Sequence, residues 1–423
     1  MSRSDPVPIS RTSHWLDTAA SVSLVVMTLV FFAIPSATAQ TFQVFYSFTG
    51  KAGAGPYGQL VMDAAGNLYG TTTYGGNQYD AGAVYKLNST GGASLLYPFT
   101  GGTDGGTPYA GVILDENGNL YGTTKDGGVS NGTCGTAPPA GCGVVFKLDK
   151  TGKETVLHAF TGGSDGWEPL HELTRDAAGN LYGTTEAGGG ITGGPCALSG
   201  CGTVFKISTA GKETILHAFT GKADGNIVNS RLVLDASGNI YGTAAGGGIV
   251  TGACITQGLH GCGVLFRLSK TGKDTILHSF TDGADGATPA GNLITDANGN
   301  LFGCTSVGGS FGKGTIYEFD TNGKFTVLYN FDTVDFCGGL VRDANGNFFG
   351  TASGSPDGIA FEVDASGKFT QLHGFTGESD GGEPLSQPIL DPQGNLYGTT
   401  YFGGLTCPDG LGDGCGVVYK ITP

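Results

Sequence analysis

One short stretch of the chain, WEPLHE (residues 167–172), concentrates side chains that could bind a ligand or move protons. It contains an indole, two carboxylates and an imidazole, from Trp167, Glu168, His171 and Glu172. An amide and a guanidinium, from Asn229 and Arg231, follow further along the chain. An imidazole beside carboxylates can act as a general acid or base, so His171 and Glu172 are the candidate catalytic residues. Whether these groups meet depends on the elements that carry them.

Those elements belong to an internal repeat. The motif DAAGNLYGTT begins at Asp63 and again at Asp176, and looser copies recur. The Gly-Asn pair of the motif begins at seven glycines: Gly66, Gly118, Gly179, Gly238, Gly299, Gly346 and Gly394. A period near fifty residues is typical of stacked supersecondary units, each of which needs a neighbour to bury its apolar face.

Each repeat contains four short runs that predict β-strands. In the copy from Pro169 they are PLHELTRD, AAGNLYGTT, CGTVFKIS and TAGKETILHAF, which we term strands A, B, C and D. The runs are rich in β-branched and aromatic residues and show no helical period. The A–B and C–D connections are tight turns at one end of the unit, whereas the B–C and D–A connections are longer and vary. We therefore expect one uniform face and one variable face.

Seven such units predict an all-β fold, a seven-bladed β-propeller of four-stranded antiparallel blades. Residues 42–50 resemble a D strand, and residues 416–423 resemble a C strand. The counts of the four strand types agree only if the N-terminal strand joins the last blade and closes the ring. We expect residues 40–423 to form this propeller, with residues 41–49 as the outer strand of its last blade.

The motifs DAAGNLYGTT, GCGVVFKL and GKETVLHAF resemble the GloVer-type Gly-rich tandem repeats of secreted bacterial proteins. The resemblance covers essentially the whole chain after residue 39. It implies a propeller related in layout to NHL-type repeats, with strand A innermost, and it implies no particular activity.

The first 39 residues are interpreted as a signal peptide. Arg3 and Arg11 precede an apolar run that ends at the small residues Ala37 and Ala39. We expect cleavage after Ala39, no stable membrane insertion afterwards, and a secreted, periplasmic or cell-surface protein; an uncleaved anchor is the alternative.

The composition excludes one class of partner. The chain has a net charge of -15 and only 13% charged residues. Phosphate binding needs clustered Lys and Arg, so we expect no nucleic-acid partner. We also expect a monomer without a cofactor.

The ten cysteines of an exported chain favour disulfides. Eight of them occur as local pairs in B–C loops: Cys134 with Cys142, Cys196 with Cys201, Cys254 with Cys262, and Cys407 with Cys415. Cys304 and Cys337 could bridge adjacent blades or remain unpaired. A zinc site is the weaker alternative for the loop pairs, because their spacing differs from paired CxxC knuckles and only His260 lies in such a loop. We therefore expect no metal.

Most repeated polar residues are interpreted as scaffold. One Asp closes each A–B turn, whereas a calcium loop would concentrate several oxygen ligands. The histidines of the LHAF-type motifs share their position with tyrosines, which suits packing better than catalysis. A second repeated Asp lies in the D–A loops; Asp-Gly turns explain it, and a ring of calcium or sugar contacts is the alternative.

Function is expected where the copies differ. Counting back four residues from the Asp that closes strand A gives a row that is polar or small in every copy: Gln59, Gly111, Glu172, Arg231, Asn292, Gly339 and Gln387. If strand A is innermost, this row rings the mouth of the central channel, where a ligand would bind. The predicted ligand-binding residues are Gln59, Trp167, Glu168, His171, Glu172, Asn229, Arg231, Asn292 and Gln387.

Two function classes stay open. The first is a binding or interaction module for an extracellular polysaccharide or a surface protein. The second is a propeller enzyme of lyase or lactonase type that works with His171 and Glu172; no G-x-S-x-G motif indicates a serine hydrolase. Binding is favoured because the chain offers one plausible cluster and polar residues commonly fill a wet channel mouth. Under either hypothesis we expect replacement of His171 and Glu172 by Ala to leave folding nearly unchanged.

Overall fold

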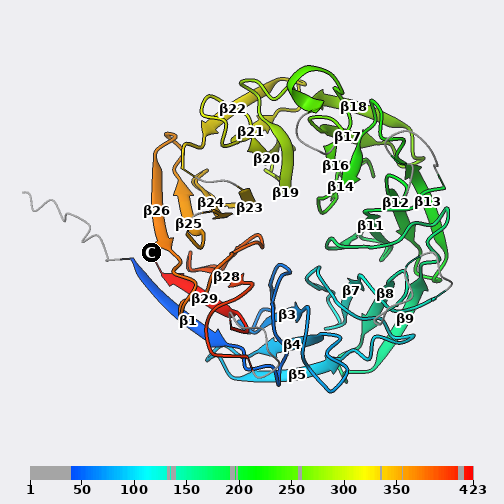
Figure 1. Cartoon of the computed structure of the whole chain (residues 1–423), viewed down its shortest axis with the longest axis vertical. Helices are drawn as coiled ribbons and strands as arrows, with labels where there is room; N and C mark the ends of the chain where they lie inside the picture. Colours follow the sequence, from blue (N-terminus) through cyan, green and yellow to red (C-terminus); the bar gives the residue numbers. More distant parts are fainter. Residues whose placement is uncertain are drawn as a thin grey trace, which may run out of the picture. The chain divides into compact units, whose positions relative to one another are not determined.

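The seven repeats form seven antiparallel sheets arranged in a ring (Figure 1). The computed structural model describes residues 40–130, 134, 140–190, 196, 199–255, 260–333, 336–354, 356–407 and 414–422. Residues 40–423 form one compact unit. The predicted signal peptide lies outside the described residues. The described part of the chain contains no helix with the length and apolarity needed to cross a bilayer.

The strands follow the chain blade by blade, from the channel outward. Blade 1 contains β2 (Val61–Met62), β3 (Leu68–Thr72), β4 (Ala83–Leu87) and β5 (Ala93–Pro98). Blade 2 contains β6 (Ile113–Leu114), β7 (Leu120–Thr124), β8 (Val144–Leu148) and β9 (Glu154–Ala159). Blade 3 contains β10 (Thr174–Arg175), β11 (Leu181–Thr185), β12 (Thr203–Ile207) and β13 (Glu213–Ala218). Blade 4 contains β14 (Asn226–Val228), β15 (Val233–Leu234), β16 (Ile240–Gly246), the 3₁₀ turn η2 (Gly252–Ile255), β17 (Val264–Leu268) and β18 (Asp274–Ser279). Blade 5 contains β19 (Ala287–Thr295), β20 (Leu301–Val307), β21 (Thr315–Phe319) and β22 (Phe325–Asn330). Blade 6 contains β23 (Phe336–Arg342), β24 (Phe348–Ser353), β25 (Ile359–Val363) and β26 (Phe369–Gly374). Blade 7 contains β27 (Ile389–Leu390), β28 (Leu396–Thr400), β29 (Val417–Thr422) and β1 (Thr41–Ser47).

The ring is closed by its first strand, as predicted. β1 pairs with β29 from Thr41↔Thr422 to Ser47↔Val417, so one blade contains both ends of the propeller. The predicted fold class is confirmed: each blade has four antiparallel strands, and in blade 4 the innermost strand is interrupted, so that both β14 and β15 pair with β16.

One aromatic pair packs each blade against the next. A Phe that follows every outer strand is fully buried or nearly so, and its ring lies 4.9–5.4 Å from an aromatic ring on the third strand of the following blade. The pairs are Phe48–Tyr85, Phe99–Phe146, Phe160–Phe205, Phe219–Phe266, Phe280–Tyr317, Phe331–Phe361 and Phe375–Tyr419. Edge-to-face pairs add roughly 0.5–1.5 kcal/mol beyond their buried area. The core is therefore a cycle of interfaces between blades.

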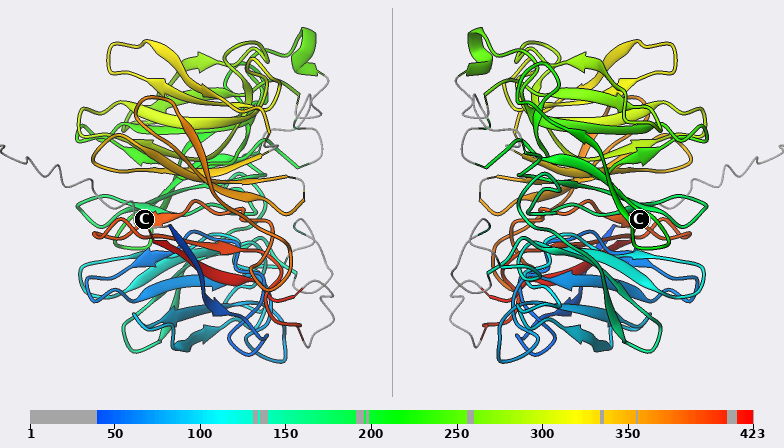
Figure 2. Two further views of the ribbon diagram at one scale, coloured as in Figure 1. Left: turned by 90° about the vertical axis from the view of Figure 1, so that its left-hand side faces the viewer. Right: turned by 90° about the vertical axis from the view of Figure 1, so that its right-hand side faces the viewer.

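The turn role of the repeated Asp in the A–B connections is confirmed. In blade 1, Asp63 Oδ1 accepts hydrogen bonds from the backbone N–H groups of Ala65 and Asn67, and Oδ2 accepts from Asn67 Nδ2 and Tyr69 Oη. The bond from the backbone N–H four residues later recurs in all seven copies. These turns form the uniform face. Figure 2 shows the sheets edge-on, with strands running across the thickness of the ring between its two faces.

Six non-glycine residues in the D–A connections or at the start of the inner strands have a left-handed backbone, with φ between 50° and 60°: Thr107, Glu168, Ile227, Asp282, Thr288 and Glu383. Such a conformation is strained and persists only where the surroundings hold it. Four of these residues donate their N–H to a carbonyl in the B–C loop of the preceding blade, for example Thr288 to Cys262 at 2.9 Å. The strained residues therefore tie neighbouring blades together on the variable face.

Five disulfides are present, and they confirm the predicted pairing. Four lie within a B–C loop: Cys134–Cys142, Cys196–Cys201, Cys254–Cys262 and Cys407–Cys415. The fifth, Cys304–Cys337, joins β20 of blade 5 to β23 of blade 6. It resolves the alternative that the sequence left open.

Candidate functional site

A cavity of about 250 Å³ lies where the inner segments of several blades meet. It is lined by five of the predicted ligand-binding residues: His171, Glu172, Asn229, Asn292 and Gln387. They come from segments just before β10 and β27, from the interruption between β14 and β15, and from β19. The inner backbones approach one another closely here: a Cβ on Gly111 would lie 2.0 Å from the carbonyl oxygen of Gln59.

Glu172 is the central hydrogen-bond acceptor of this site. It is buried, and its Oε1 accepts hydrogen bonds from the backbone N–H groups of Gln59 at 3.1 Å and Gly111 at 3.3 Å. Its Oε2 accepts from Asn292 Nδ2 at 3.2 Å. One carboxylate of blade 3 thus joins blades 1, 2 and 5. In contrast to the expectation from sequence, we expect replacement of Glu172 by Ala to destabilise the fold, because three donors would lose their acceptor.

The electrostatics favour an ionised Glu172 beside a neutral His171. Burial raises the pKa of Glu172, but the backbone hydrogen bond from Gln59, together with the charge of Arg231, outweighs it and holds that pKa below its usual range. Burial lowers the pKa of His171, and the charge of Glu172 opposes this only in part. At neutral pH His171 is therefore an uncharged imidazole that faces the cavity.

Arg231 lies on the other side of the polar row. Its backbone N–H donates to Asn292 Oδ1 at 2.7 Å, and its Nε donates to Thr174 Oγ1 at 3.4 Å. It lines a second cavity of about 380 Å³, together with Gln387, which lines both. The row of aligned inner positions is therefore a hydrogen-bonded layer between two cavities, and the guanidinium is on the side away from His171.

Three predicted residues, Gln59, Trp167 and Glu168, line neither cavity. Trp167 donates from Nε1 to Ser199 O at 3.1 Å and packs against a cluster that includes Cys134 and Cys142. Glu168 is one of the left-handed residues and forms an ion pair with Lys125 at 3.5 Å. The structure therefore separates the ends of the WEPLHE stretch: its second half faces the channel, and its first half supports a loop. Gln59 contributes its backbone N–H to the site.

Two further tyrosines line the cavity, Tyr57 and Tyr109, and neither was predicted from the sequence. Their rings are 5.1 Å apart in an edge-to-face arrangement. Burial, followed by neighbouring tyrosine charge, raises the pKa of Tyr57, so its phenol stays protonated. Both tyrosines follow a Pro in the D–A connection, a position that varies between copies, and this variation was the available signal.

No Lys or Arg occurs among the described residues that line the first cavity, whereas two carboxylates, Glu172 and Glu186, do line it. Burial, with the nearby charge of Glu168, raises the pKa of Glu186. One acceptor is unused: Asn229 donates from Nδ2 to Pro289 O at 3.1 Å, but its buried Oδ1 has no hydrogen-bond partner. The arrangement suits a ligand that offers hydroxyl or amine donors and an apolar face.

The chain matches the model of the Gloeobacter/Verrucomicrobia repeat over residues 27–255 and 139–352. No curated protein matches it significantly. Among solved structures, a streptogramin B lyase is 13% identical with a TM-score of 0.57, over 90% of this chain and 97% of that one. A virginiamycin B lyase from Staphylococcus aureus is 12% identical with a TM-score of 0.58, over 91% and 99%. A putative 6-phosphogluconolactonase from Bacteroides uniformis is 14% identical with a TM-score of 0.50, over 81% and 89%. At these identities the likeness shows the propeller fold alone.

Proposed function

We propose that this chain is an exported binding module that holds the end of an uncharged glycan chain in the cavity at the channel mouth. The chain belongs to the Gloeobacter/Verrucomicrobia repeat family. The observation that carries the proposal is the lining itself: two tyrosine rings, three amides and two carboxylates, without a cation among the described lining residues. Export is supported by the predicted signal peptide and by five disulfides, which persist in oxidising compartments.

The chemistry of the lining selects the ligand class. Aromatic faces pack on the apolar C–H faces of a sugar ring, and amides and carboxylates accept hydrogen bonds from its hydroxyls. The free Oδ1 of Asn229 is the acceptor that a hydroxyl would satisfy. An anionic ligand would meet the Glu172 carboxylate and no cation among the described lining residues, so phosphorylated or acidic sugars are disfavoured. The volume of about 250 Å³ lies below the usual range of roughly 300–1,000 Å³ for drug-sized ligands, which favours the end of a chain over a folded surface protein.

The test is a screen of neutral and acidic oligosaccharides, followed by calorimetry on each ligand that binds. We expect Tyr57→Ala and Tyr109→Ala each to weaken binding roughly tenfold, which corresponds to about 1.4 kcal/mol of lost aromatic contact. Tyr79→Ala is the matched control, because Tyr79 is 59% exposed and does not line the cavity. A ligand that all three variants bind equally, or a preference for acidic sugars, would contradict the proposal.

A second candidate function is acid–base catalysis by His171, in a reaction of lyase or lactonase type. It is supported by the uncharged imidazole at the cavity surface, which is the form a general base needs. Glu172 would act on His171 through its charge, because its own oxygens already accept three hydrogen bonds from other residues. Turnover of any ligand found in the screen, abolished in His171→Ala with binding retained, distinguishes this function from simple binding.

A further inference from the structure

A different group of side chains lies on the outer strands, away from the channel. Four outer strands carry a His followed seven residues later by an Asp of the D–A loop. At three of these positions the pair is hydrogen-bonded: His217 with Asp224 at 3.3 Å, His278 with Asp285 at 2.9 Å, and His373 with Asp380 at 2.9 Å. The fourth pair is open. His158 Nε2 lies 3.6 Å from Asp165 Oδ2, and this nitrogen has no hydrogen-bond partner.

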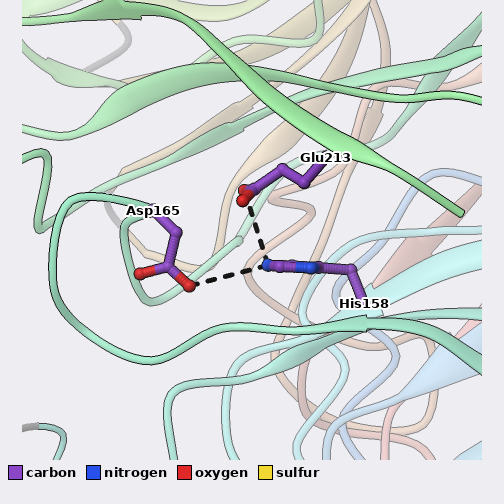
Figure 3. A group of neighbouring side chains, drawn as sticks. All are labelled: His158, Asp165 and Glu213. Carbon is purple, nitrogen blue, oxygen red and sulfur yellow. Dashed lines mark ion pairs between the residues drawn. The ribbon is translucent and has the colours of Figure 1, made fainter.

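The fourth pair is open because the next blade contributes a third group. Glu213, the first residue of β13, places Oε1 3.4 Å from His158 Nε2, so the imidazole nitrogen lies between two carboxylates (Figure 3). The position of Glu213 is aromatic at two other interfaces. Phe325 stacks on His278 at 3.9 Å, and Phe42 stacks on His373 at 3.6 Å. At the interface of blades 2 and 3 an acid therefore occupies the position that a stacking ring occupies at these two interfaces.

Two of the three groups, His158 and Glu213, are poorly satisfied as they stand, whereas the Asp165 carboxylate accepts hydrogen bonds from the N–H and the hydroxyl of Thr161. Their side chains are 14–19% exposed, and both His158 Nε2 and Glu213 Oε1 are buried atoms without a hydrogen-bond partner. Burial, with the nearby charge of Asp165, raises the pKa of Glu213 to about 7. A buried carboxylate without a partner is costly, and it is normally retained only where a cation or a hydrogen-bond donor compensates for it.

We propose that His158, Asp165 and Glu213 form a metal site for a divalent first-row transition ion, of which Zn²⁺ is the representative. The three candidate ligand atoms lie within 4.8 Å of one another, and they form the one such group of three among the described residues. One imidazole nitrogen and two carboxylate oxygens form a ligand set that suits zinc, whereas Ca²⁺ takes six to eight oxygens.

The proposed ion would act as a clip between two blades. His158 belongs to β9 of blade 2 and Glu213 to β13 of blade 3, both at the outer edge of the ring (Figure 1). Three protein ligands leave one tetrahedral position for water. The ion would bind the neutral imidazole and both ionised carboxylates. The clip would stabilise the folded chain by mass action.

The next interface provides a matched control. Asp274 is the first residue of β18 and corresponds to Glu213, but its side chain is one methylene shorter. The His217–Asp224 pair beside it is already hydrogen-bonded. Asp274→Phe therefore changes an equivalent acid without touching the proposed ligands, whereas Glu213→Phe introduces the residue type that other blades use at this position.

The test is calorimetric titration of the EDTA-treated chain, begun at Gln40, with Zn²⁺, Mn²⁺ and Ca²⁺. We expect one equivalent of Zn²⁺ and an upward shift of the melting temperature in the unaltered chain and in Asp274→Phe, and loss of both effects in Glu213→Phe and in the isosteric Glu213→Gln. Zinc binding that survives in the Glu213 variants would overturn the proposal. The proposal would also be overturned if the unaltered chain bound no Zn²⁺ and Glu213→Gln raised its stability. That result would mean that the carboxylates of Glu213 and Asp165 share a proton. If Glu213→Phe does not fold, Glu213→Gln and His158→Gln decide the outcome.

Discussion

At the scale of single residues, Glu172 shows how a polar side chain can serve the fold and the site together. Its two oxygens receive three hydrogen bonds from other blades, and the same side chain sets the charge of the cavity. The sequence placed Glu172 in a polar inner row, but it could not show that two of its three donors would be backbone groups. That fact depends on how closely the glycine-bearing inner strands approach, which alignment of the copies does not reveal.

The stability of the chain should depend on the ionised form of Glu172. Its pKa is lower in the folded chain than its usual value, so the stabilisation is complete above the unfolded pKa of about 4.3 and is lost as the pH falls through the folded value. We expect Glu172→Gln to lower the free energy of unfolding by roughly 1.5–3 kcal/mol at pH 7, and the difference from the unaltered chain to shrink at pH 3. Denaturant titrations at both pH values measure this. The exposed Glu378→Gln is the control, and a pH-independent difference would contradict the argument.

At the scale of elements, four strands, two tight turns and two variable loops per repeat were predictable from alternation and glycine placement. The interruption of the inner strand in blade 4 and the left-handed residues of the D–A loops were not. Both arise from contacts between blades, such as the bond from the Thr288 N–H to Cys262 O. The missed tyrosines belong to the same loops, one position after the repeated Pro, outside the row that the alignment selected.

The disulfides differ in what they connect, so their removal should have different effects. Cys304–Cys337 joins two blades across 33 residues, whereas Cys254–Cys262 closes 8 residues within one loop. The loop-entropy relation gives roughly 3.7 and 2.5 kcal/mol respectively. We therefore expect Cys304→Ala with Cys337→Ala to lower the melting temperature more than Cys254→Ala with Cys262→Ala, as measured by calorimetry. Equal losses would mean that the disulfide between blades stabilises the chain no more than a disulfide within one loop does.

At the scale of the whole molecule, stability is cyclic. Seven aromatic pairs, one at each interface, bury the rings of consecutive blades, and the interface between blades 7 and 1 exists only because both ends of the propeller share one sheet. The count of strand types predicted this closure from the sequence. The last repeat has no outer strand of its own, and the N-terminal strand is an outer strand without a repeat, so each completes the other.

Removal of β1 should therefore weaken the whole ring. A chain that begins at Phe48 retains the aromatic ring that contacts Tyr85, but it loses the six residue pairs that join β1 to β29. We expect a lower melting temperature and an exposed edge on β29 that promotes aggregation. A chain that begins at Gln40 is the control. Identical melting curves for the two chains would show that closure by β1 does not hold the ring.

The register of β1 and β29 also determines how the molecule would respond to tension. Thr41 pairs with Thr422, so two tethers attached at these residues would pull on the same end of an antiparallel pair. The load would fall on one hydrogen-bonded pair at a time and peel the strands apart in sequence, without shearing all of them at once. The pairing that closes the propeller and stabilises it against heat would thus separate under low force when the chain is stretched between its ends.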